Sequence, residues 1–177
     1  MDARWWFSLL VLLVAGERIA ELAVARRNRR RALAAGGIEY GAGHYPVIVA
    51  LQVGLLAGSV LEVWLRDPPI RPILSGSMLV LLLLAQGLRW WCIATLGPQW
   101  NTRIIVVPGL GRRRWGPYRW IPHPNYLAVV VEGIALPLIG SAWITAIAFT
   151  AANSALLGWR IRVENRALLR LTETRQP

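Results

Sequence analysis

The sequence predicts an all-α, polytopic membrane protein that forms a single domain over residues 1–177. Of the 177 residues, 55% are hydrophobic and only 16% are charged, whereas a soluble domain carries roughly 25% charged residues. The apolar residues also come in blocks rather than evenly spread. A helix of about 20 apolar residues crosses a ~30 Å hydrocarbon core, so each long block is a candidate membrane span.

The first half of the chain contains three predicted spans. The first covers about residues 5–25 and begins with three aromatic residues, which prefer the membrane interface. The second covers about residues 46–65, between Tyr45 and Trp64 near its ends. The third, at about residues 73–96, contains the most continuous apolar stretch of the chain.

The last two predicted spans form a helical hairpin. Between residues 125 and 160 the chain is almost continuously apolar, which is too long for one ordinary crossing. Pro137 and the pair Gly140-Ser141 lie near its middle. We therefore expect helices over about 125–140 and 142–160 joined by a tight turn, which brings the total to about five spans.

The distribution of arginine predicts the orientation. All twenty cationic residues are arginine, and fifteen of them fall on one side of a five-span arrangement. Cytoplasmic loops carry such an excess, so we expect the N-terminus outside, the C-terminus in the cytoplasm and the protein in the inner (cytoplasmic) membrane. A net charge of +11 also suits nucleic acid, but several apolar blocks argue against such a module, and we expect no nucleic-acid partner.

The N-terminal block has a second interpretation. Residues 5–15 resemble the apolar region of a signal peptide, with Val14-Ala15-Gly16 as a poor cleavage site. The periodic apolar pattern continues beyond this point to the arginines after residue 25. This continuation favours a retained span.

Several polar or reactive residues lie inside predicted spans, where ionisable groups are costly. Glu17 and Glu21 share a helix face, and we expect them to pair with arginines of other helices or to reach the interface, with Arg18 pointing elsewhere. Glu132 lies about two turns into the fourth span and must face a cavity or a cationic partner; both readings stay open. Cys92, the single cysteine, permits no internal disulfide, and we expect an inert buried thiol and no metal site.

Two polar features bracket the C-terminal hairpin. The first, at residues 116–126, holds turn formers, aromatics and His123, and Pro124 suits the first turn of a helix, whose free N–H groups favour an anionic group. The second is the pair Arg160 and Glu164, which share a helix face. An interfacial histidine and a surface ion pair are the ordinary interpretations. Because a hairpin brings both features to one membrane face, they also predict a single site.

One combination of motifs, spread over the C-terminal half of the chain, indicates a protein family. It consists of Gly116–Arg119, His123–Tyr126, Glu132, Pro137, and the pair Arg160-x-x-x-Glu164. Together these residues resemble the isoprenylcysteine carboxyl methyltransferase family, most closely its small bacterial branch, whose members look like O-methyltransferases of alkylpyrones and related lipids. Further similarity occurs around Glu21 with Arg26-Arg27-Asn28 and at residues 96–103. The resemblance extends over most of the chain and is strongest over residues 96–170.

The resemblance implies an S-adenosylmethionine site at the cytoplasmic face, with methyl transfer to a carboxylate, enol or phenol oxygen of a lipophilic substrate within the membrane lipids. The residues that it implies as cofactor contacts are Tyr118, His123, Asn125, Tyr126 and Glu164. Arg160 would orient or neutralise the acceptor oxygen. A carboxylate or acidic enol is already ionised near neutral pH, whereas a phenol needs a general base, for which His123 and Glu132 are the candidates.

This chain departs from the family pattern at two positions. Pro122 stands where an arginine usually precedes His-Pro, and Asn165 stands where many members have a second acid, which leaves Glu164 as the only acid of the tail motif. Two other functions stay open: an NADPH-dependent membrane reductase of sterol or enone type, and a non-catalytic membrane scaffold or small transporter. Residues 109–111 lack the strand-turn-helix context of a dinucleotide site, which argues against the reductase. A transporter would spread its polar residues along a path through the bilayer, whereas here they gather on the expected cytoplasmic side.

Overall fold

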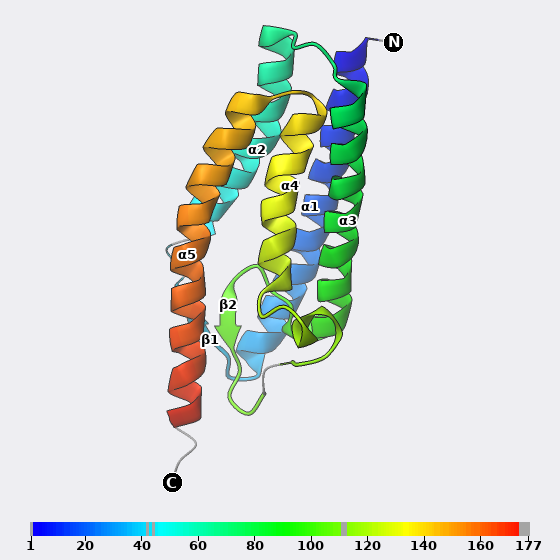
Figure 1. The fold of residues 1–177 in the computed structure, drawn as a ribbon. Helices are drawn as coiled ribbons and strands as arrows, with labels where there is room; N and C mark the ends of the chain where they lie inside the picture. Colours follow the sequence, from blue (N-terminus) through cyan, green and yellow to red (C-terminus); the bar gives the residue numbers. More distant parts are fainter. Residues whose placement is uncertain (1, 42, 44, 111–112, 174–177) are drawn as a thin grey trace.

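The computed structural model describes residues 2–41, 43, 45–110 and 113–173. Five α-helices run alternately up and down in an elongated bundle (Figure 1). They are α1 (Ala3–Ala34), α2 (Tyr45–Arg66), α3 (Pro72–Leu96), α4 (Pro124–Ile139) and α5 (Trp143–Glu173). Two 3₁₀ turns, η2 (Gly97–Gln99) and η3 (Gly116–Arg119), lie in the connector between α3 and α4.

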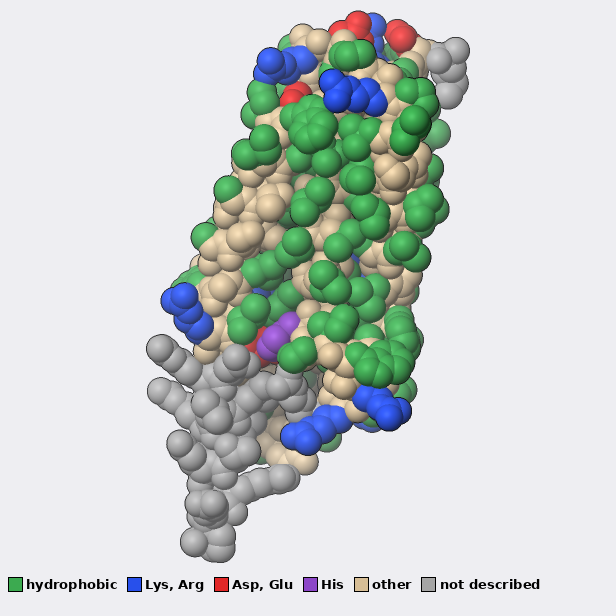
Figure 2. Space-filling model, in the orientation of Figure 1, with side chains coloured by type: hydrophobic (Ala, Val, Ile, Leu, Met, Phe, Trp, Pro, Cys, Tyr) green, Lys and Arg blue, Asp and Glu red, His purple; other side chains and the backbone are tan. Residues whose placement is uncertain are grey.

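The bundle is apolar on its outside as well as in its core. A small core cluster joins the helices, with Phe7, Leu136 and Ile139 among its fully buried members. Large apolar side chains are exposed along the helices, for example Leu12, Val53 and Leu83 at 66%, 58% and 62%. Figure 2 shows hydrophobic side chains over the middle of one face and arginines toward both ends. A surface of this kind matches a hydrocarbon solvent rather than water.

The five helices fall where the five spans are predicted, but they are not equally suited to a membrane. Two segments are long and apolar enough to cross one by length and composition, Tyr45–Arg66 and Pro72–Gln99. The helix Pro124–Ile139 is apolar but shorter. Helices α1 and α5 extend beyond the predicted spans through arginine-rich segments, because Arg and Ala are good helix formers even where no membrane surrounds them. The helical fold class is thus confirmed, while five crossings stay a prediction.

The structure shows the predicted helical hairpin of α4 and α5, while its role in a cofactor site stays a prediction. Helix α4 ends at Ile139 and α5 begins at Trp143. Ser141 lies in the turn with a positive φ of 58° and donates its hydroxyl to the carbonyl oxygen of Pro69 at 3.2 Å. The hairpin places the start of α4 at the same end of the bundle as the C-terminal part of α5 (Figure 1).

A two-stranded ribbon is the element that the all-α prediction omitted. β1 (Ile38–Tyr40) pairs antiparallel with β2 (Ile104–Val106), and Glu39 lies opposite Ile105. Each strand has only three residues, which is too short for an alternating pattern to stand out from a loop. The ribbon lies at the end of the bundle where α1 and α3 end (Figure 1).

Candidate active site

A cavity of about 420 Å³ lies at the end of the bundle that carries the ribbon. Small-molecule sites commonly enclose roughly 300–1,000 Å³. The C-terminal turns of α1, the connector between α3 and α4, the first turn of α4 and the C-terminal part of α5 all contribute to its wall. The wall is apolar at Leu96, Leu110 and residues 104–107 and polar elsewhere. The cavity therefore suits a ligand, or a pair of ligands, with both polar and apolar parts.

Six of the seven predicted site residues line this one cavity. They are Tyr118, His123, Asn125, Tyr126, Arg160 and Glu164. These side chains come from η3, from the start of α4 and from α5, which the hairpin brings together. The structure thus places both sequence features at one site.

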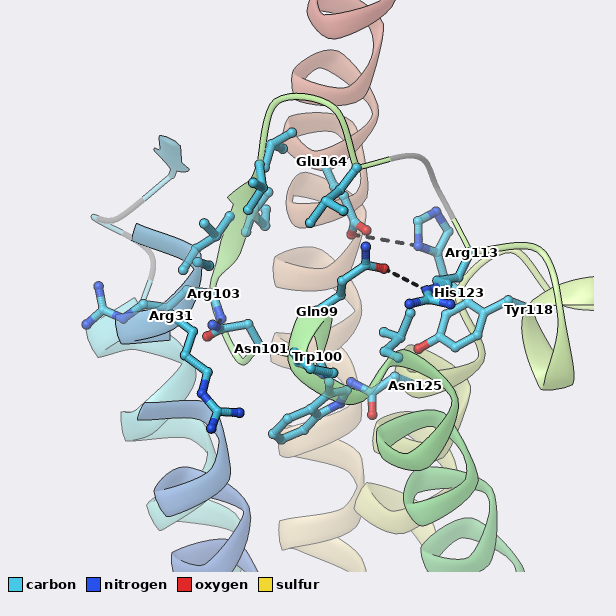
Figure 3. Close-up of a pocket in the computed structure, with 18 of the residues that line it drawn as sticks. Arg31, Gln99, Trp100, Asn101, Arg103, Arg113, Tyr118, His123, Asn125 and Glu164 are labelled. Atoms are coloured by element: carbon cyan, nitrogen blue, oxygen red, sulfur yellow. Dashed lines mark hydrogen bonds and ion pairs between the residues drawn. The ribbon is translucent and has the colours of Figure 1, made fainter. Parts of the chain in front are cut away.

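The centre of the site is a cluster around the Glu164 carboxylate. The Tyr126 hydroxyl donates to Glu164 Oε2 at 2.6 Å, and His123 Nδ1 lies 3.7 Å from the same oxygen (Figure 3 shows the latter pair). The guanidinium of Arg160 lies 5.3 Å from the centre of the Tyr126 ring and donates to the carbonyl oxygen of Thr102. These contacts fix the orientations of the carboxylate and the guanidinium at the cavity wall.

The local sequence explains how α4 begins at the cavity. His123 is the N-cap residue, and Pro124 occupies the first turn, where its missing N–H costs no hydrogen bond. The N–H groups of Tyr126 and Leu127 donate to the His123 carbonyl at 3.1 and 3.3 Å. The predicted role of Pro124 is confirmed, and the helix start presents His123, Asn125 and Tyr126 to the cavity.

Tyr118 reaches the site because η3 packs closely on α3. Gly116 has a φ of +60°, and a Cβ there would lie 2.6 Å from the Thr95 hydroxyl oxygen, so glycine permits the approach. The Tyr118 hydroxyl meets the buried Cys92 thiol. Burial and the neighbouring Cys92 raise the pKa of Tyr118 well above its usual range. Tyr118 therefore stays protonated and serves as a hydrogen-bond donor rather than a base.

The cavity also contains polar residues outside the predicted site list. They are Arg31, Gln99, Trp100, Asn101, Arg103 and Arg113 (Figure 3). The Asn28 amide fixes the turn that carries Trp100, since Nδ2 donates to the carbonyl oxygens of Gly97 and Trp100 at 3.0 and 2.9 Å. The similarity at Asn28 and residues 96–103 was the available sequence signal for this part of the wall.

Two buried polar atoms at the cavity have no hydrogen-bond partner within the part of the chain that the structure describes. They are the donor Nε1 of Trp100 and the acceptor Oδ1 of Asn125. A buried polar atom left unpaired costs about 1–3 kcal/mol. The pair therefore suits a ligand that offers both a hydrogen-bond acceptor and a donor.

Glu132 is the predicted site residue that the cavity does not include. It is 1% exposed and pairs with two arginines from other helices. Arg18 Nε donates to Glu132 Oε1 at 3.2 Å, and Arg89 donates to Oε2. Of the two readings open for Glu132, the structure shows the cationic partner. The expectation that Arg18 points elsewhere is wrong, because its long side chain reaches both Glu21 and Glu132.

Glu132 belongs to a buried ionic cluster between α1, α3 and α4. Arg89 also lies 3.6 Å from Glu21, and Arg18 donates to Gln86 at 3.1 Å. Gln86 in turn donates to Glu17. The cluster joins three helices, and the pairing expected for Glu21 with arginines is confirmed. Buried charges of this kind are tolerated when each has an opposite charge and hydrogen bonds.

Fold and site together define a class: a helical, membrane-adapted protein with a mixed polar and apolar cavity at its arginine-rich end. Residues 78–170 match the model of the isoprenylcysteine carboxyl methyltransferase (ICMT) family. The chain is 38% identical over 164 residues to the uncharacterized protein YpbQ of Bacillus subtilis (strain 168), an alignment that covers 93% of this chain and 96% of that protein. The chain belongs to the ICMT family, a family of membrane-bound methyltransferases. The predicted resemblance is confirmed, and the bacterial relative is consistent with a small bacterial branch.

Proposed function

We propose that this protein transfers a methyl group from S-adenosylmethionine to an oxygen of a lipophilic acceptor at the cytoplasmic face of the inner membrane. Family membership supports methyl transfer. The observation that carries the cofactor and the site is the convergence of six motif residues on one cavity of about 420 Å³. The acceptor oxygen is proposed to belong to a carboxylate, an enol or a phenol.

The residues at the cavity fit the chemical groups of S-adenosylmethionine. The unpaired Trp100 Nε1 and Asn125 Oδ1 match the acceptors and donors of a nucleoside. The Glu164 carboxylate, beside the Tyr126 ring, suits a cationic group. Arg113, which donates to Gln99 at 3.2 Å, suits a carboxylate. When bound, the cofactor supplies an electrophilic methyl group on a sulfonium.

The protein's own task in such a transfer is to position the acceptor and exclude water. Arg160 is held by the Thr102 carbonyl and the Tyr126 ring at the cavity wall. Its guanidinium is proposed to orient and stabilise an ionised acceptor oxygen. A carboxylate or acidic enol then needs no base, and a phenol would give its proton to His123. Glu132, the other candidate base, is proposed to hold the helices instead, because two arginines occupy its carboxylate.

The surfaces support a lipophilic acceptor that arrives from the membrane. Apolar side chains cover the outside of the helices. The ribbon strand β2 and the segment after it continue this apolar character into the cavity wall through residues 104–107 and Leu110. The proposed orientation, with the N-terminus outside, puts this end of the bundle in the cytoplasm, where S-adenosylmethionine is made.

Two measurements test the proposal. Calorimetric titration of the purified protein with S-adenosylmethionine and, separately, with NADPH should show binding of the first only. NADPH binding alone would support the reductase, and binding of neither would support a scaffold.

The second measurement identifies the acceptor. Incubation of the purified protein with a lipid extract and methyl-labelled cofactor should label a lipid. Alkali releases labelled methanol from a methyl ester but leaves enol and phenol ethers intact, which separates the acceptor classes. A labelled amine or thioether would contradict oxygen methylation.

A further inference from the structure

The β1–β2 ribbon forms one side of the cavity but has little to hold it in place by itself. Strand β2 contributes Ile104, Ile105 and Val106 to the cavity wall, whereas β1 contributes none of its residues. An isolated two-stranded ribbon is only marginally stable in water, and each of these strands has three residues. The position of this wall therefore depends on contacts between the ribbon and the helices.

Glu39, the central residue of β1, makes ion pairs with two arginines. Its Oε2 accepts hydrogen bonds from Nε and a terminal nitrogen of Arg29 at 3.2 and 3.0 Å, and its Oε1 accepts one from Arg103. The Glu39 side chain is 13% exposed. One carboxylate thus joins the C-terminal part of α1 to the residue that precedes β2.

The arginine partners of Glu39 favour its ionised form. Burial opposes ionisation, but the hydrogen bonds and charges of Arg103 and Arg29 outweigh it and lower the pKa of the Glu39 carboxyl. A lowered pKa means that the stabilisation is present above the usual value of this group and is lost only as the pH falls through the folded value. The ion pairs are therefore complete at neutral pH.

Further contacts pack the ribbon closely against the helices of the bundle. The Arg103 guanidinium lies 4.0 Å from the centre of the Tyr45 ring at the start of α2. A Cβ at Gly37 would lie 3.0 Å from Cγ2 of Ile105 and 2.6 Å from the carbonyl oxygen of Ala32. The ribbon is thus in contact with α1 at Gly37 and, through Arg103, with α2. Arg103 also lines the cavity, so Glu39 fixes a residue of the wall directly.

We infer that Glu39 is a positioning residue for methyl transfer: it holds β2 and Arg103 as a fixed wall of the cavity, although it does not line the cavity itself. This inference rests on the proposed function. Glu39 lies before the family match at residues 78–170, so the N-terminal part of the chain completes a site whose motif residues all come from the C-terminal part. A fixed wall keeps the acceptor and the methyl donor aligned and limits the entry of water.

The experiment compares Glu39→Gln with a matched control, Glu62→Gln. Glu62 is also a partly buried carboxylate that joins two elements, because it accepts hydrogen bonds from the N–H groups of Ile144 and Thr145 at 3.0 and 2.8 Å. It lies at the opposite end of the bundle, where α5 begins. Both proteins are purified at full length, and three properties are compared: the affinity for S-adenosylmethionine, the steady-state kinetics of methyl transfer, and amide hydrogen exchange.

Glu39→Gln should weaken S-adenosylmethionine binding or raise the KM for the acceptor about tenfold, which corresponds to ~1.4 kcal/mol. Amide exchange at residues 104–106 should become faster, while that of α4 stays as in the wild type. Glu62→Gln should keep the wild-type affinity and KM even if its Tm falls. If Glu39→Gln does not fold, Arg29→Gln replaces it, since this variant leaves the Arg103 pair intact and should change the same quantities by a smaller factor.

Two different failures are distinguishable. Wild-type affinity and KM in Glu39→Gln, with faster exchange at residues 104–106, would show that the ribbon contact is only structural and would overturn this inference alone. Absence of S-adenosylmethionine binding by the wild type would overturn the proposed function, and the positioning role would fall with it.

Discussion

Glu164 is the acid among the described residues that line the proposed cofactor site. Its carboxylate accepts a hydrogen bond from the Tyr126 hydroxyl and lies close to the His123 ring. Glu164→Gln keeps the shape of the side chain but removes its charge. S-adenosylmethionine affinity should fall about 100-fold or more, because a cationic group loses its charged partner. Calorimetric titration measures this change, and circular dichroism shows whether the fold is retained. A folded Glu164→Gln protein with unchanged affinity would remove Glu164 from the site.

Arg160 is the residue proposed to act on the acceptor rather than on the cofactor. Arg160→Ala should leave S-adenosylmethionine affinity within about twofold of the wild type and slow methyl transfer by about 10²-fold, which is typical of the loss of one donor that stabilises a developing or resident oxyanion. A single-turnover assay with saturating cofactor measures this effect. Arg162→Ala is the matched control, because Arg162 is exposed and lies outside the cavity. Full activity in Arg160→Ala would contradict the assignment.

At the scale of single residues, local sequence motifs were enough to select six of the residues that line the cavity, and their functional roles stay predictions. Tyr118, His123, Asn125 and Tyr126 are close in sequence, and Arg160 and Glu164 are one helical turn apart. Gln99 and Trp100 were not in the predicted list, because their position depends on a turn that Asn28 fixes from another helix. Residue spacing does not report such a contact, and the family resemblance at Asn28 and residues 96–103 was the signal that pointed to this part of the chain.

The helices themselves are joined by the buried cluster around Glu132. Glu132→Gln leaves Arg18 and Arg89 without one of their acids. Breaking a buried pair from one side costs about 3–5 kcal/mol, so Tm should fall by roughly 10 °C for a chain of this size. Thermal unfolding in detergent measures the shift.

A functional control separates this role from catalysis. Below its Tm, the Glu132→Gln protein should turn over within about threefold of the wild-type rate, because neither Glu132 nor its partners Arg18 and Arg89 line the cavity. An unchanged Tm combined with methyl transfer slowed by roughly two orders of magnitude would return Glu132 to the catalytic residues.

Among the elements, long apolar helices were predictable and short or charged ones were less so. Helices α2 and α3 follow their apolar blocks closely. Helix α1 continues beyond the predicted span limit near residue 25, because the arginines there mark the limit of a membrane span but not of a helix. The ribbon was missed because Ile38–Tyr40 pairs with a segment far along the chain, and its register follows from the way the helices bring the two segments together.

For the whole molecule, an asymmetric orientation in the membrane is expected. Single cysteines placed in a Cys92→Ala background report it. Pro69→Cys, in the α2–α3 loop, should react with a membrane-impermeant maleimide in intact cells. Arg114→Cys, in the connector at the cavity end, should react only after permeabilisation. Both native side chains are exposed. Any difference in labelling between the two positions therefore reports the side of the membrane on which each one lies. The opposite labelling pattern would put the cavity outside and contradict a cytoplasmic cofactor.

The molecule combines an apolar exterior, a buried ionic cluster and a polar cavity at one end, and the central claim is that this cavity holds S-adenosylmethionine. Ultraviolet cross-linking of radiolabelled S-adenosylmethionine to the wild-type protein, followed by peptide mapping, tests the claim most directly. The label should fall on peptides that contain the cavity residues between Gln99 and Tyr126 or between Arg160 and Glu164, and unlabelled cofactor should compete it away. Competed label confined to α2, or to the end of the bundle where α5 begins, would contradict the claim.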